Sequence, residues 1–173
     1  MEKVMTLFIG CDHGGYELKQ SVLSFLNSSS TAPFGTLQIK DFGCHSQESV
    51  NYPEFADLVC QSLLKNLYEK SGNLPLKETL SVNDALSFDS LGLLICGTGQ
   101  GMALKANKYK DIRAALVWNE EISKLAREHN NANILCLPGR FMTSETAISC
   151  LIHFLTTPFS KGRHSERVKK INL

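Results

Sequence analysis

Residues 91–101 are the part of this chain best suited to chemistry. An apolar run ends on the thiol of Cys96, and a loop follows in which glycines alternate with Thr98 and Gln100. Such a loop exposes successive backbone N–H groups that can hold an anion. A thiol at the carboxyl end of a strand, facing the start of a helix, is stabilised as a thiolate and suits a nucleophile or a base. The pattern predicts a reactive sulfur beside an anion site.

Other interpretations of this loop stay open. It is neither a Walker A sequence nor a GxGxxG fingerprint, so the pattern alone gives weak support to nucleotide binding. An ordinary strand-to-helix turn, in which glycines ease packing, explains the loop as well as an anion site does. Buried cysteines usually behave as small hydrophobic residues, yet the position of Cys96 favours a functional role.

Asp12 and His13 stand at the end of the first apolar run, before Gly14 and Gly15. Asp12 is explained well as the cap of the helix that follows. Capping does not explain His13.

His129 ends a stripe of residues on the predicted helix 119–129, after Ile122, Leu125 and Ala126. This spacing indicates an inward face. A buried, hydrogen-bonded histidine is the common outcome at such a position. The end of a helix also favours an imidazolium, which suits a general acid.

The C-terminal segment SKGRHSERVKK is basic, and its usual interpretation is a solvated face. Arg163 and Arg167 are spaced i and i+4, so on a helix they point the same way and could grip a phosphate together. Arg140, which follows another apolar run, could join them.

Short apolar runs at 6–10, 36–42, 91–96, 113–118 and 133–137 alternate with helical patterns at 15–27, 53–70, 101–108, 119–129, 143–156 and from about 164. This alternation predicts an α/β fold, a three-layer Rossmann-like sandwich with a five-stranded parallel sheet and helices on both faces. Ligands of such sheets lie beyond the carboxyl ends of the strands. We expect one domain over residues 1–173, with an insertion at 71–90.

Composition limits the possible partners. The chain has 173 residues, 43% of them hydrophobic, and a formal net charge of +1, which argues against wholesale binding to nucleic acid or to a membrane surface. The N-terminus lacks the pattern of a signal peptide, and no segment is apolar enough to span a membrane, so a cytoplasmic location is expected. The six cysteines are expected to be free thiols, and no cluster has the spacing of a metal site.

Five segments taken together resemble the sugar-phosphate isomerases of the ribose-5-phosphate isomerase B type, a family that includes the galactose-6-phosphate isomerase subunits. They are DHGGYELK (12–19), NYPEFA (51–56), CGTGQGMALKANK (96–108), REHNNANIL (127–135) and GRHSERV (162–168). The match covers nearly the whole chain in the correct order. The segments 27–36 and 71–90 are longer than in the compact form of the family.

The resemblance implies interconversion of D-ribose 5-phosphate and D-ribulose 5-phosphate, in the pentose phosphate pathway, through an enediolate and without a metal or other cofactor. It assigns Cys96 as the base, His129 as the proton donor for ring opening, and the loop with Thr98 as the anion hole. It also implies a homodimer whose sites are shared between subunits. The implied substrate-binding residues are Asp12, His13, Tyr52, Gly97, Thr98, Gly99, Gln100, Gly101, Asn130, Arg140, Arg163 and Arg167.

The chemistry of the reaction agrees with these assignments. A weakly acidic C–H proton needs a placed base and donors aimed at the developing oxyanion, and a phosphate needs cationic anchors away from the reacting carbons. Two alternatives remain open: an isomerase of a hexose 6-phosphate of the allose or galactose type, and a sugar-phosphate or nucleotide binding module without turnover. The presence of both a thiol base and a histidine acid argues against mere binding.

Overall fold

The computed structural model describes residues 4–28, 33–70 and 89–171 of the chain. Its five parallel strands form a single sheet in the order β2-β1-β3-β5-β4. The strands are β1 (Met5–Cys11), β2 (Leu37–Asp41), β3 (Ser90–Cys96), β4 (Ala114–Leu116) and β5 (Ile134–Pro138). Each lies within two residues of its predicted bounds, and the predicted five-stranded parallel sheet is confirmed.

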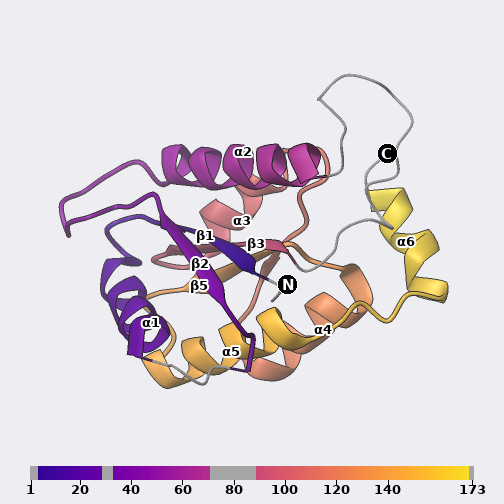
Figure 1. The fold of residues 1–173 in the computed structure, drawn as a ribbon. Coiled ribbons are helices and arrows are strands. Elements are labelled where there is room, and N and C mark those ends of the chain that lie inside the picture. Colours follow the sequence, from indigo (N-terminus) through magenta and orange to yellow (C-terminus); the bar gives the residue numbers. More distant parts are fainter. Residues whose placement is uncertain (1–3, 29–32, 71–88, 172–173) are drawn as a thin grey trace.

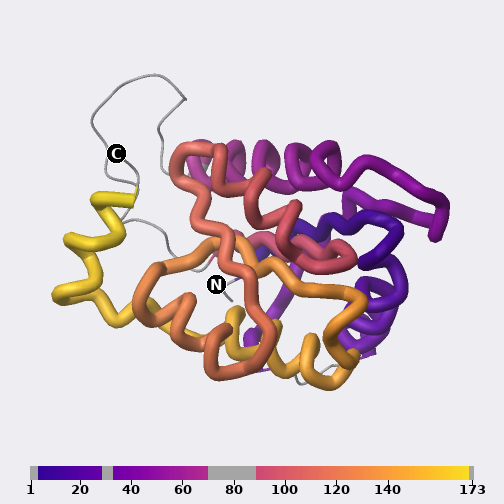
Figure 2. The backbone as a smooth tube through the Cα atoms, turned by 180° about the vertical axis from the view of Figure 1, so that it is seen from behind, coloured from indigo at the N-terminus to yellow at the C-terminus, as the bar shows by residue number. Residues whose placement is uncertain are grey.

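Helices cover both faces of this sheet, so the predicted three layers are also confirmed (Figure 1). The helices are α1 (Tyr16–Ser28), α2 (Tyr52–Lys70), α3 (Gln100–Ala106), α4 (Glu120–Asn130), α5 (Ser144–Thr156) and α6 (Arg163–Ile171). One face carries α2 and α3, and the other carries α1, α4 and α5. Helix α6 stands away from the sheet and packs against α4, as Figures 1 and 2 show from opposite sides. Residues 71–88 of the predicted insertion lie outside the described residues.

Position in the sheet explains the burial pattern of each strand. The central strands β1, β3 and β5 are buried along their whole length, because helices cover both of their faces. The edge strand β2 alternates between exposed and partly buried residues, and β4 is partly buried throughout. The continuous apolar runs in the sequence are therefore the three central strands.

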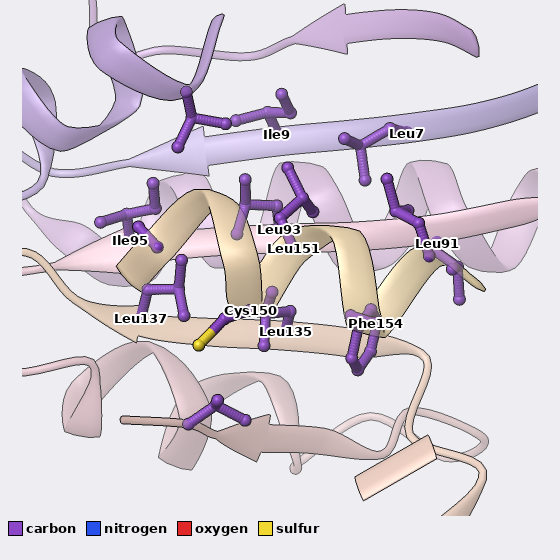
Figure 3. Close-up of a cluster of buried hydrophobic side chains, with 14 of the residues drawn as sticks. Leu7, Ile9, Leu91, Leu93, Ile95, Leu135, Leu137, Cys150, Leu151 and Phe154 are labelled. Carbon is purple, nitrogen blue, oxygen red and sulfur yellow. The ribbon is translucent and has the colours of Figure 1, made fainter. Parts of the chain in front are cut away.

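The two faces of the sheet carry separate apolar clusters. On one face, side chains of α5 such as Leu151 and Phe154 pack on Leu93 and Leu135 of the central strands (Figure 3). On the other face, Phe8, Leu94 and Cys136 meet residues of α2 and α3. Cys96 belongs to this second cluster, so its side chain points toward the α2 and α3 layer.

The inward face of α4 differs from the predicted stripe. The buried residues are Ser123, Ala126 and Arg127, whereas Ile122, Leu125 and His129 are only partly buried. Polar contacts explain why Ser123 and Arg127 face inward. The Ser123 hydroxyl donates to the Cys150 carbonyl at 2.7 Å, and Arg127 donates to the Ala132 carbonyl. The Arg127 guanidinium also lies 5.4 Å from the centre of the Phe154 ring.

Candidate active site

Three loops meet where β1, β3 and β5 end, and glycines let them touch. A Cβ on Gly15 would lie 2.3 Å from the carbonyl oxygen of Ile95, and a Cβ on Gly139 would lie 2.7 Å from the carbonyl oxygen of Gly14. A Cβ on Gly14 would lie 3.0 Å from the backbone of Gly97. Because any side chain would separate these loops, the glycines hold the residues that follow each strand close together.

Cys96 is the last residue of β3 and is fixed from two sides. Its carbonyl accepts hydrogen bonds from the N–H of Gly139, at 2.8 Å, and from that of Gly99, at 3.3 Å. The loop turns at Gly99, which has φ +71°, a conformation that favours glycine. The Cys96 side chain is 4% exposed and stands directly before the glycine loop.

Arg140 brings a positive charge to the same loop from the end of β5. Its N–H donates to the Gly97 carbonyl at 3.1 Å. Its Nε atom would lie 3.5 Å from a Cβ built on Gly97, so the exposed side chain runs along the loop. An anion held by the loop would have this guanidinium beside it.

Asp12 and His13 approach the loop from the end of β1. Oδ1 of Asp12 accepts from the N–H of Gly15 at 3.0 Å, so this carboxylate closes the turn that precedes α1 and does not cap the first turn of the helix as predicted. Nδ1 of His13 accepts from the N–H of Val50 at 3.3 Å. In the neutral imidazole this bond leaves the proton on Nε2, which can donate to a ligand.

Tyr52, the first residue of α2, lies against the far end of the loop. A Cβ on Gly101 would be 2.7 Å from Cζ of the tyrosine ring. The ring is 39% exposed and forms a wall at this edge of the sheet. The carboxyl edge thus collects Asp12, His13, Tyr52, Cys96, Gly97, Thr98, Gly99, Gln100, Gly101 and Arg140.

His129 and Asn130 lie at the opposite edge of the sheet. They end α4, which connects two parallel strands and so runs back to the edge where β5 begins. Just after them, Asn133 accepts from the N–H of Arg113, at 2.8 Å, immediately before β4. Since the five residues of β5 alone span about 13 Å, Cys96 and His129 of one chain cannot serve one sugar together.

Arg163 and Arg167 share that distant edge. Both are exposed on α6, and α6 is held to the end of α4, away from the loops that surround Cys96 (Figure 1). The predicted site residues therefore fall into two groups at opposite edges of the sheet.

Known proteins match almost the entire chain. A family model described as Ribose/Galactose Isomerase matches residues 7–72 and 80–171. The chain belongs to the ribose/galactose isomerase family. A probable ribose-5-phosphate isomerase B from Mycoplasma pneumoniae is 37% identical over 166 residues, which are 95% of this chain and 91% of that protein. A ribose-5-phosphate isomerase B from Mycolicibacterium paratuberculosis is 34% identical and covers 95% of this chain and 87% of its own.

Solved structures of ribose/galactose isomerases share the fold. The crystal structure of a ribose 5-phosphate isomerase B from Thermotoga maritima has a TM-score of 0.79 and 39% identity, covering 97% of each chain. The enzyme from Mycoplasma genitalium, solved with bound ribulose 5-phosphate, has a TM-score of 0.77 and 36% identity. It covers 96% of this chain and 93% of its own.

Lys19 is a buried residue of this ribose/galactose isomerase that the sequence patterns did not single out. Its ammonium group is fully buried and donates to both carboxylate oxygens of Asp41, at 2.8 and 2.9 Å, and to the Cys44 carbonyl at 2.7 Å. The backbone of Cys44 in turn bonds to that of Cys11. Lys19 therefore supports the loops that carry Asp12. Its position beside Leu18 and Val22 on the inward side of α1 was the available signal.

Four of the other thiols of this ribose/galactose isomerase are poor candidates for a base. Burial raises the pKa of Cys60 to about 12 and that of Cys150 to about 11. Burial also raises the pKa of Cys11 and Cys136 well above the ordinary range of a thiol. These sulfurs remain protonated near neutral pH.

Two features of the described residues concern other kinds of site. Within the described ranges, no group of three or more His, Cys, Asp or Glu side chains has an arrangement that could hold a metal ion. In the same ranges, no helix combines the length and the apolar composition that crossing a membrane requires.

Proposed function

We propose that this chain interconverts D-ribose 5-phosphate and D-ribulose 5-phosphate through an enediolate, with Cys96 as the base. The observation that carries this proposal is the position of Cys96: a thiol at the end of the central strand β3, directly before a glycine loop along which the Arg140 side chain runs. Membership in the ribose/galactose isomerase family supports the same substrate class.

The reaction moves one proton between neighbouring carbons. The Cys96 thiolate takes the proton from C2 of the open aldose, and the carbonyl oxygen at C1 becomes negatively charged. Return of the proton to C1 and reprotonation of O1, while O2 loses its proton to become the carbonyl, complete the ketose. Amides of residues 97–101 and the Thr98 hydroxyl stabilise the charged oxygen. The Gly99 N–H already donates to the Cys96 carbonyl and the Gln100 N–H to the Thr98 hydroxyl, so the amides of Gly97, Thr98 and Gly101 carry most of this role.

A complete site needs two copies of the chain. Cys96, the loop and Arg140 lie at the carboxyl edge of the sheet, while His129, Asn130, Arg163 and Arg167 lie near the amino edge. A homodimer with a two-fold axis brings the amino edge of each copy to the carboxyl edge of the other and forms two equivalent sites. In this dimer Arg163 and Arg167 hold the phosphate, and Arg140 assists them.

In this dimer His129 acts as the acid that opens the sugar ring. Ribose 5-phosphate exists mainly as a five-membered ring, and opening breaks the C1–O4 bond while the anomeric hydroxyl loses its proton. Protonation of O4 by His129 makes it a neutral leaving group. Asn130 and Tyr52 contact the sugar hydroxyls. We place the reaction in pentose phosphate metabolism and in the cytoplasm, where the free thiols of all six cysteines fit a reducing compartment.

The test is an isomerase assay on purified protein with ribose 5-phosphate, with EDTA present. Cys96→Ala should lower kcat about a thousandfold, whereas the matched control Cys150→Ala, another buried thiol, should retain kcat. In deuterated water, label should enter C1 or C2 of the product. Wild-type turnover by Cys96→Ala would exclude this base.

The same assay separates the alternatives. Higher kcat/KM with allose 6-phosphate or galactose 6-phosphate than with ribose 5-phosphate would identify a hexose phosphate isomerase. Saturable binding of ribose 5-phosphate without any turnover would identify a binding module.

A further inference from the structure

The imidazole rings of His129 and His164 lie face to face. Their centroids are 4.3 Å apart and their planes differ by 6°. His129 belongs to the last turn of α4, and His164 to the first turn of α6. The His164 side chain is buried, with 9% of the residue exposed, while His129 is half-buried. The stack is a contact between the proposed ring-opening acid and the helix that carries the proposed phosphate ligands.

The backbone fixes this contact from both sides. The Ser160 N–H donates to the Glu128 carbonyl at 3.0 Å, which ties the approach to α6 onto the end of α4. Lys161 and Gly162 then take left-handed conformations, with φ of 56° and 58°, and turn the chain. The His164 N–H closes the turn on the Lys161 carbonyl at 3.1 Å. A non-glycine residue with positive φ is uncommon and marks a turn that the surrounding structure imposes.

The surroundings of His164 oppose a positive charge on its ring. The pKa of His164 is lowered, first by burial and then by the nearby rings and charges of His129 on α4 and of Arg163 and Arg167 on α6. The nearby carboxylates face other cations, since Glu166 lies 2.9 Å from Lys169 and Glu128 lies 3.7 Å from Lys124.

The dipoles of the two helices act differently on the two rings. The C-terminal end of α4 favours a positive charge at His129, and the N-terminal end of α6 disfavours one at His164. The two helix ends therefore favour a positive charge on the His129 ring over one on the His164 ring.

A bound phosphate changes the charges around the stack. Arg163 and Arg167 flank His164 on α6 and are, by the proposed function, the phosphate ligands. A dianion between them cancels the repulsion that they exert on an imidazolium. Occupation of the phosphate site should therefore raise the affinity of the stack for a proton, so that the acid needed for ring opening is loaded when substrate is present.

We propose that His164 is a positioning residue for His129, whose stacked ring orients the proton donor and makes protonation of the pair depend on an anion bound at Arg163 and Arg167. This inference rests on the proposed function for the roles of His129 and the two arginines. To the proposed function it adds a role for His164 and a coupling between phosphate binding at the two arginines and protonation of the histidine pair.

The first test follows the histidine ring signals by NMR during a pH titration, with and without sulfate. Sulfate is a dianion that does not itself titrate near neutral pH, and chloride at equal ionic strength is the control. The pKa of His164 should rise when sulfate is added. The Arg163→Gln/Arg167→Gln double variant should show a higher pKa of His164 without sulfate and no response to it. The His153 signal, from α5, should not respond to sulfate in either protein.

The outcomes distinguish this inference from the proposed function. Sulfate that binds without moving the pKa of His164 overturns the coupling and leaves the isomerase proposal intact. Sulfate that does not bind at the two arginines overturns both the coupling and the proposed phosphate site. Because these signals do not depend on turnover, the result is independent of the assay of Cys96.

The second test separates two contributions of His164: the stacking of its ring, which orients His129, and the titration of its imidazole. His164→Phe keeps a flat ring for stacking, whereas His164→Ala removes it. We expect His164→Phe to retain kcat for ribose 5-phosphate within about twofold and His164→Ala to lower it about tenfold. The pH profile of kcat should also change in His164→Phe, because one partner of the coupled pair no longer titrates. Equal kcat in the two variants, or a wild-type pH profile in His164→Phe, would overturn the positioning role.

Discussion

The ring of Tyr52 lies across Gly101, so closely that a Cβ on the glycine would be 2.7 Å from the tyrosine Cζ. The contact joins the first residue of α2 to the glycine loop that follows Cys96. A glycine is therefore needed at position 101 to let the Tyr52 ring approach, in addition to the backbone amide that this residue contributes to the loop. The aromatic wall of the proposed site and its anion loop are therefore a single packed unit.

Gly101→Ala should displace the Tyr52 ring and raise the KM for ribose 5-phosphate about fivefold, equivalent to a loss of about 1 kcal/mol in binding free energy. Steady-state kinetics measure this change, and a thermal melt checks that the protein remains folded. In Tyr52→Ala the same glycine substitution should cost much less, because the clashing ring is gone. Additive effects of the two substitutions would show that the ring contact is not the cause.

Lys19 should be important for stability because it is the buried partner of Asp41. Lys19→Met leaves the partly buried Asp41 carboxylate without its cation and should lower the free energy of unfolding by about 3 kcal/mol, measured by urea denaturation. Adding Asp41→Asn should restore part of this loss, because the unpaired charge disappears. Lys65→Met, which breaks an exposed pair with Glu69, should cost less than about 0.5 kcal/mol. Similar losses in Lys19→Met and Lys65→Met would contradict the role of the buried pair.

The fold, and the gathering of the residues that follow the central strands at one edge of the sheet, could be predicted because both depend on patterns that are local in the sequence. Buried central strands give continuous apolar runs, and the ends of these runs mark the edge of the sheet where Cys96 and Asp12 lie. The location of His129 at the opposite edge was not predicted, although it follows once the parallel sheet is known, since a helix between parallel strands ends at the amino edge. Buried charges were less accessible: Lys19 and Arg127 resemble surface residues until their partners, Asp41 and the Ala132 carbonyl, are brought to them by the fold.

His164 should make stability depend on pH in the acidic range. Its pKa is lowered in the folded protein, by burial first and then by His129 and the two arginines. Between that lowered value and the ordinary value of about 6.5, the unfolded chain binds a proton that the folded chain does not. The free energy of unfolding should therefore fall as the pH drops through about 6.5 and level off below the folded pKa.

Urea denaturation at a series of pH values measures this dependence. His164→Phe should flatten the curve in this range, because the residue that titrates differently in the two states is absent. The control His153→Phe should keep the pH dependence of the free energy of unfolding seen in the wild-type protein. A wild-type slope in His164→Phe would assign the effect to another group.

His129→Ala should separate ring opening from proton transfer. The variant should accept mainly the open aldose, so at high enzyme concentration the conversion of ribose 5-phosphate becomes limited by spontaneous ring opening. The rate then stops rising as enzyme is added. Ribulose 5-phosphate has its O5 blocked by phosphate and cannot close into a five-membered ring, so its consumption should stay proportional to enzyme. A forward rate that stays proportional at every enzyme concentration would remove ring opening from the roles of His129.

Mixing two variants that each convert ribose 5-phosphate slowly on their own should reveal whether the two edges of different copies form one site. Cys96→Ala damages the carboxyl edge and His129→Ala the amino edge, so a mixed dimer contains one site with both defects and one with neither. After unfolding and refolding together in equal amounts, the mixture should recover about a quarter of wild-type activity, because half of the dimers are mixed and each has one intact site. His129→Ala mixed with Arg167→Ala, which both damage the amino edge, should recover none. Recovery in neither mixture would mean that each chain forms its site alone, which the distance between Cys96 and His129 opposes.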